Sequence, residues 1–230
     1  MQRTKLAERT LPDYTLGEEI CNTVTHAPGI AFGIVTLMLC TFAALKEGDT
    51  FRLVGACVYG ISLTALYSMS TIYHASAPGI SKKILQILDH CTIYFLIAGT
   101  YTPILLGPFM EYSSATAWTI LAAVWSLCII ATVFTAIDLN GFRKLSMTCY
   151  IGTGWIIIIF LKPAIQSMTL AGFLYLLYGG IAYTIGVVFY SIGSKYHKRY
   201  MHSVFHVFVL LGSVLQFVAV YRYCILTTPQ

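Results

Sequence analysis

Long stretches without charge constrain this chain more than any other feature. No Asp, Glu, Lys or Arg occurs in residues 53–81, 112–137, 145–161 or 163–194. A helix needs about 20 predominantly apolar residues to cross the hydrocarbon core of a bilayer. Of the 230 residues, 57% are hydrophobic and 10% are charged, whereas a soluble domain carries about 25% charged residues. We therefore expect an integral membrane protein rather than a soluble one.

Charged residues, prolines and glycines divide the chain into seven apolar segments. We expect an all-α bundle with seven transmembrane helices, near residues 28–45, 52–74, 84–106, 115–137, 145–161, 170–191 and 202–222. Residues 1–27 are polar and contain no leading apolar block, so they predict a cytosolic N-terminal segment rather than a signal peptide. Residues 28–230 are expected to form a single membrane domain.

The basic residues predict the orientation of this bundle. Ten of the 14 Lys and Arg residues fall on the side of the N-terminus, and the other four fall on the opposite side. Cytoplasmic loops carry an excess of basic residues. The N-terminus is therefore expected in the cytosol and the C-terminus outside, in a multi-pass protein of the plasma membrane.

All six histidines fall on the predicted cytosolic side; they are His26, His74, His90, His197, His202 and His206. The pair in the seventh helix stands four residues apart, which places both side chains on one helix face. An ionisable group near this depth costs about 2.5–3.5 kcal/mol if it faces lipid. We therefore expect His74, His202 and His206, together with Asp89, to face one another inside the bundle. His197 is interpreted as a solvated loop residue, and His90 is expected to point away from the others.

Three of these histidines make a plausible zinc site. His74, His202 and His206 are predicted to be the ligands, since three protein ligands and a water are typical of catalytic zinc. Zinc lowers the pKa of such a water to about 7. Asp89 lies one turn into the third helix and is expected to orient or deprotonate the water. Ser70, four residues before His74, is placed to hydrogen-bond the water or a substrate carbonyl.

The same residues have non-catalytic interpretations. The two histidines of the seventh helix could form a polar cap at the membrane interface. Asp89 could form an ion pair with Lys82 or Lys83 at the rim of the bundle. Ser70 could hydrogen-bond the carbonyl four residues earlier in its own helix. The seven cysteines form no CxxC motif, so a zinc–thiolate site is not expected.

A further polar group precedes the first apolar segment in the stretch EEICNTVTH. Glu19, Asn22 and His26 lie at positions i, i+3 and i+7, which is one helical face. Pro28 follows and is expected to limit the continuity of the helix. This face is interpreted as a polar latch between the N-terminal segment and the bundle. The alternative is that it braces the zinc site or supplies His26 as another ligand.

These motifs resemble the hemolysin III family, the bacterial branch of the progestin and adipoQ receptor (PAQR) family. The resemblance rests on EEICNTVTH, on S-x3-H from Ser70 to His74, on DHCTIYFLIAGTYTP from Asp89, and on H-x3-H from His202 to His206. The motifs occur in the family's order over residues 18–222.

The resemblance implies seven helices with a cytosolic N-terminus and zinc held by the three histidines, with Asp89 and Ser70 close by. Related animal receptors resemble lipid-amide hydrolases that act on ceramides, and the alkaline ceramidases are similar in their Ser, Asp and three-His pattern. Bacterial members are associated with membrane lipid homeostasis.

Two functions follow as hypotheses. The first is a zinc-dependent, ceramidase-like hydrolase that cleaves an amide or ester of a membrane lipid. The second is a non-enzymatic sensor or regulator of the membrane, in which zinc staples the helices together. A hemolytic pore is disfavoured, because no predicted helix carries the line of polar residues that a pore needs. Membrane lipids are the expected partners, and nucleic acid is not.

Overall fold

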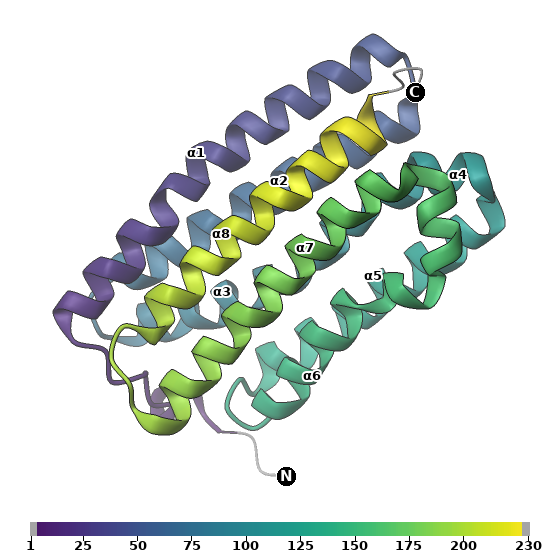
Figure 1. The fold of residues 1–230 in the computed structure, drawn as a ribbon. Coiled ribbons are helices and arrows are strands. Elements are labelled where there is room, and N and C mark those ends of the chain that lie inside the picture. The colour runs from purple at the N-terminus through teal and green to yellow at the C-terminus, as the bar shows by residue number, and fades with distance from the viewer. Residues whose placement is uncertain (1–3, 227–230) are drawn as a thin grey trace.

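The chain folds into a bundle of long helices (Figure 1). The structure, a computed structural model, describes residues 4–226, and these contain no β-strand. The elements are the 3-10 helix η1 (Leu6–Glu8), α1 (Leu16–Glu47), α2 (Thr50–Ala75), α3 (Ile80–Leu106), α4 (Pro108–Tyr112), α5 (Ser114–Ile137), α6 (Arg143–Gly154), the 3-10 helix η2 (Ile156–Phe160), α7 (Leu161–Tyr196), α8 (Met201–Val220) and the π-helix η3 (Tyr221–Ile225). The predicted all-α class is confirmed.

Six segments of the described chain are long and apolar enough to cross a membrane; they are Leu16–Glu47, Thr50–Ala75, Ile80–Leu106, Ser114–Ile137, Arg143–Tyr196 and Met201–Ile225. The fifth of these contains α6, η2 and α7. Within it, Arg143 donates a hydrogen bond to Ser194, while Gln166 accepts one from Tyr112 at the other end of the bundle. The chain therefore runs along the bundle through α6 and η2 and returns through α7. Seven membrane crossings and a cytosolic N-terminus stay predictions.

The outward-facing surface of the bundle is apolar. Val35, Met38 and Phe42 of α1 are 50–66% exposed, and Ile129 and Ile130 of α5 are 53–56% exposed. Contiguous exposed apolar surface of this kind marks contact with lipid rather than water. Polar residues of the helices, among them Asn22, Ser70 and Gln86, are buried in the interior instead.

Glycines allow α1 and α2 to approach closely. A Cβ atom added to Gly60 of α2 would lie 2.4 Å from Cα of Leu37 in α1. Small residues at helix interfaces permit this approach in membranes, where close packing replaces the hydrophobic effect as the main cause of association. The close pairing fixes the polar face of α1 against the end of α2.

The first helix begins much earlier than the sequence pattern predicts. α1 starts at Leu16 rather than at residue 28, because Thr15 and Glu18 form a reciprocal capping box. Pro28 lies inside α1, so the expectation that it limits helix continuity is wrong. A proline removes one backbone hydrogen bond, and the packing of α1 against α2 and α8 outweighs that loss.

The predicted end of the fifth helix near residue 161 and the predicted start of the sixth near residue 170 both fall within or next to α7. α7 contains a break at Thr169, whose φ of 64° lies in the left-handed region, and the predicted sixth helix begins at the next residue. Lys162 and Pro163, which follow the predicted fifth segment, lie in the first turn of α7. Proline is tolerated there because the first turn of a helix has backbone N–H groups without partners.

Candidate metal centre

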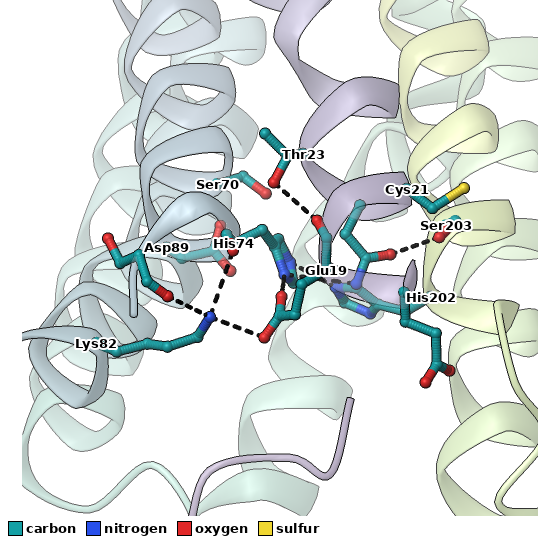
Figure 2. A network of polar contacts seen from close by, with 12 residues as sticks. Glu19, Cys21, Thr23, Ser70, His74, Lys82, Asp89, His202 and Ser203 are labelled. Atoms are coloured by element: carbon teal, nitrogen blue, oxygen red, sulfur yellow. Dashed lines mark hydrogen bonds and ion pairs between the residues drawn. The ribbon is translucent and has the colours of Figure 1, made fainter. Parts of the chain in front are cut away.

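The three predicted zinc ligands lie together at one end of the bundle. His74 comes from the last turn of α2, and His202 and His206 come from the first two turns of α8. One ring nitrogen from each lies within 4.8 Å of the others, and Nε2 of His74 is 3.1 Å from Nε2 of His202. Figure 2 shows these last two rings side by side. Two nitrogens on one tetrahedral zinc lie about 3.3 Å apart, given bonds of about 2.0–2.1 Å. The rings are thus close to the spacing that a metal ion requires.

Hydrogen bonds at Nδ1 orient two of the three rings. His74 donates from Nδ1 to Oε2 of Glu19 at 2.6 Å, and His206 donates from Nδ1 to the carbonyl oxygen of Asn22 at 3.1 Å. A neutral imidazole that donates from Nδ1 keeps its lone pair on Nε2. Metal-binding histidines commonly have this arrangement. Nδ1 of His202 is buried and has no partner among the described residues. The donor set therefore fits a metal ion such as zinc.

Glu19 also connects the cluster to α3. Lys82 is only 3% exposed, and its Nζ lies 2.8 Å from Oε1 of Glu19 and donates to the carbonyl oxygen of Ser76 at 2.8 Å. Figure 2 shows Glu19 between Lys82 and His74. One carboxylate thus orients a candidate ligand from α2 and neutralises a buried cation from α3. Sequence spacing placed Glu19 on the right helix face but did not identify these two partners.

The rest of the EEICNTVTH face connects α1 to α8. Ser203 donates to Oδ1 of Asn22 at 2.6 Å, and Asn22 is 1% exposed. Glu18 pairs with Arg199 at 2.9 Å and accepts the backbone N–H of Tyr200 at 3.0 Å. These contacts hold the start of α8, and hence its two histidines, against α1.

Ser70 and His26 form a hydrogen-bonded pair beside the cluster. Oγ of Ser70 is 2.7 Å from Nδ1 of His26, so in this structure Ser70 pairs with His26 and not with its own backbone. The ring of His26 stacks on that of His206, with centroids 3.5 Å apart. His26 is not one of the three residues whose nitrogens converge.

Asp89 lies near the cluster without a strong ion pair. It is 9% exposed, and its Oδ2 lies 3.7 Å from Nδ1 of His90, which donates to the carbonyl oxygen of Gln86 instead. The alternative pairing with a lysine is not observed, since Lys82 contacts Glu19 and Lys83 donates to a backbone carbonyl. His90, expected to point away, lines the same cavity as Asp89.

A cavity of about 540 Å³ opens beside these residues. His26, Ser70, Asp89, His202 and His206 lie in its wall. Ligand-binding cavities of proteins typically measure about 300–1,000 Å³ and combine apolar walls with a few polar groups. The apolar part is lined by α2, α3, α7 and α8 through residues that include Leu66, Ile93, Leu96, Ile97, Phe173 and Val209. The cavity can therefore accept an apolar group whose polar end lies near the histidines.

Tyr14 is a residue of this site that the sequence analysis missed. It lines the cavity, and its ring stacks on His202 with centroids 5.3 Å apart and planes inclined by 29°. The phenol of tyrosine is protonated at neutral pH and can donate a hydrogen bond. Burial raises the pKa of Tyr14 further above its ordinary value. Because Tyr14 precedes α1, helical periodicity gave no indication of its position.

Residues 4–15, which we call the N-terminal strap, hold Tyr14 over the cluster. Thr4 donates to Oδ2 of Asp138 from its backbone nitrogen at 3.2 Å and from its hydroxyl at 3.0 Å. Arg9 donates to the carbonyl oxygen of Ile137 at 2.7 Å. Backbone N–H groups of Gly141 and Thr4 hold the pKa of Asp138 below its ordinary value.

His197, as expected, is an exposed residue between α7 and α8.

Comparisons with known proteins find a family and relatives that match this chain over most of its length. The family model for haemolysin-III-related proteins matches residues 14–217. The "Hemolysin-3 homolog" of Bacillus subtilis (strain 168) is 39% identical over 212 residues, which cover 92% of this chain and 97% of the relative. The "Hemolysin-3" of Bacillus cereus is 39% identical over 210 residues, covering 91% and 93%.

A human relative extends the match beyond bacteria. The "Monocyte to macrophage differentiation factor" of Homo sapiens is 27% identical over 223 residues, which cover 91% of this chain and 85% of the relative. The matched region of the family model contains every candidate site residue from Tyr14 to His206. The resemblance predicted from the motifs is confirmed, and the chain belongs to the haemolysin-III-related family.

Proposed function

We propose that this protein is a zinc-dependent hydrolase of a lipid amide or ester, of ceramidase-like type, which acts in lipid homeostasis of the plasma membrane. One observation carries the proposal. Three histidines present convergent ring nitrogens beside an apolar cavity, and Asp89 and Ser70 line that same cavity. This combination supplies a metal-binding group, a carboxylate and a hydroxyl where the polar end of a lipid would lie.

Each residue has a role that its position supports. His74, His202 and His206 would hold the metal. Zinc held in this way lowers the pKa of water and polarises carbonyl groups. The carboxylate of Asp89 would accept a proton from the attacking water and later pass it to the leaving group. The hydroxyl oxygen of Ser70 would accept a hydrogen bond from the attacking water and so help to orient it.

The metal content of the purified, detergent-solubilised protein tests the site directly. We expect about one zinc per chain, and we expect His74→Ala and His206→Ala to lose it, since each removes one of three ligands. His197→Ala is the matched control, because His197 is exposed between α7 and α8. A folded protein without bound metal would reduce the cluster to a polar cap and remove the basis for the enzyme.

Turnover tests the chemistry. Purified protein is incubated in mixed micelles with N-acyl amides, including a ceramide, and with acyl esters, and mass spectrometry detects the released fatty acid. Asp89→Asn should abolish release while zinc stays bound, because the amide cannot accept the proton. Unchanged release by this variant would refute the role of Asp89.

The contacts between helices favour a second candidate, a membrane sensor whose helices are held together by a metal ion. Glu19 joins α1 to α2 and α3 through His74 and Lys82, and the histidines join α2 to α8. A metal at this junction would connect helices from both ends of the chain. This candidate predicts that chelation lowers the unfolding temperature, while no lipid in the panel is altered at any zinc occupancy.

A further inference from the structure

His26 is buried beside the cluster but is placed differently from the three candidate ligands. It is 3% exposed, and Nδ1 is taken by Ser70 at 2.7 Å. The ring is held on two sides, since it stacks on His206 at 3.5 Å and meets Tyr67 edge-on at 5.2 Å and 85°. The ring therefore has one defined orientation.

The other ring nitrogen of His26 has no partner. Nε2 is buried and makes no hydrogen bond to any described residue. A buried polar atom without a partner is destabilising, so structures rarely retain one without a reason. His26 lines the cavity together with Ser70 and Asp89, and a molecule inside the cavity is the available source of a partner.

We propose that Nε2 of His26 anchors the polar group of the lipid that occupies this cavity, and that His26 binds substrate rather than metal. The proposal rests on the proposed function for its choice of a lipid. We assign the tautomer in which Ser70 donates to Nδ1, so that Nε2 carries the hydrogen and donates to the amide carbonyl.

Two substitutions test the roles of the two ring nitrogens of His26 one at a time. The side chain of Asn reaches about as far as Nδ1, so His26→Asn keeps a partner for Ser70 and removes the group at Nε2. The longer side chain of Gln places its amide near the position of Nε2, so His26→Gln keeps a group that can bind the lipid. Both variants lose the imidazole equally, which makes each the control for the other.

The experiment measures equilibrium binding of palmitamide, with heptadecane as the apolar probe of similar length. Zinc content is measured on the same samples. We expect His26→Asn to bind palmitamide about 3- to 10-fold more weakly than the wild type, which corresponds to the loss of one hydrogen bond. His26→Gln should stay within about twofold of the wild type, and heptadecane binding and zinc content should not change. Equal binding of palmitamide by His26→Asn and wild type, or loss of zinc from both variants, would overturn the proposal.

A second measurement applies even where His26→Asn does not fold. Infrared spectra of palmitamide labelled with ¹³C at the carbonyl should show a hydrogen-bonded band in the wild type and in His26→Gln. In His26→Phe, which keeps an aromatic ring against His206, the band should move toward its position in hydrocarbon solvent. An unmoved band would overturn the proposal. Because neither measurement needs turnover, His26-dependent binding without hydrolysis would refute the enzyme and leave the anchor standing.

Discussion

Replacing Glu19 by Gln tests whether the hydrogen bond to His74 prepares the ring for metal. The side chain keeps its shape but loses its charge, so it can no longer serve His74 at 2.6 Å and Lys82 at 2.8 Å together. Loss of such a partner of a metal-bound histidine weakens metal affinity about 10- to 100-fold. That range corresponds to about 1.4–2.7 kcal/mol.

The same substitution should also destabilise the fold, because Lys82 is left buried without an opposite charge. Breaking a buried ion pair by removing one partner costs about 3–5 kcal/mol. Lys82→Met separates the two effects, since it removes the cation and leaves the bond between Glu19 and His74 in place. We expect this variant to keep its zinc affinity. The double variant should regain part of the stability lost by Glu19→Gln and still bind zinc weakly.

Zinc affinity is measured by competition with a chelating dye, and stability by thermal unfolding in detergent. Glu47→Gln is the matched control, since Glu47 lies in the last turn of the same helix, far from the histidines. A zinc dissociation constant of Glu19→Gln within about twofold of the wild type would refute the assigned role of Glu19, whatever the change in stability.

Three further predictions concern the rest of the bundle. The pKa of Asp138 lies below its unfolded value of about 3.9. Its contribution to stability is therefore complete above that pH and is lost as the pH falls through the folded pKa. Hydrogen exchange at Thr4 and its neighbours should rise below about pH 4, and the variant Asp138→Asn should show the same rise already at pH 7. Gly60→Ala should destabilise the protein by about 1–3 kcal/mol in thermal unfolding, because the added Cβ would lie 2.4 Å from the backbone of α1. Gly152→Ala is the control and should be neutral in the same assay, since no atom lies within 4 Å of its added Cβ. Arg52→Met should cost about 1–3 kcal/mol for each of the two η3 carbonyls that lose the buried guanidinium as a donor. Zinc content should not change, because Arg52 lies at the opposite end of α2 from His74; a parallel loss of zinc would contradict this prediction.

Sequence spacing identified the histidines well because each lies at a helix end. The interval of four residues between His202 and His206 fixes a shared face, and the predicted depth of His74 matches theirs. Helical periodicity also placed Glu19 on the inner face. It could not choose the partner of Lys82, because that choice depends on how α1 is rotated against α3.

The start of α1 could have been read from the sequence. Thr15 and Glu18 form the T-x-x-E pattern of a capping box, but the polar residues that follow do not resemble a membrane helix. Tyr14 had no such pattern. Its position depends on hydrogen bonds from the strap to Asp138 and Ile137, which lie more than 100 residues away in the chain.

The distribution of the histidines over the chain sets the order in which the protein can be assembled. His74 and His202 are separated by 128 residues. At about 5–20 residues per second, synthesis of the interval takes about 6–26 s. During that time α1, α2 and α3 can already join through Glu19 and Lys82, but two of the three candidate ligands do not yet exist. Metal loading would therefore follow synthesis of nearly the whole membrane domain, and a nascent chain stalled before α8 would be inserted but unable to hold the ion.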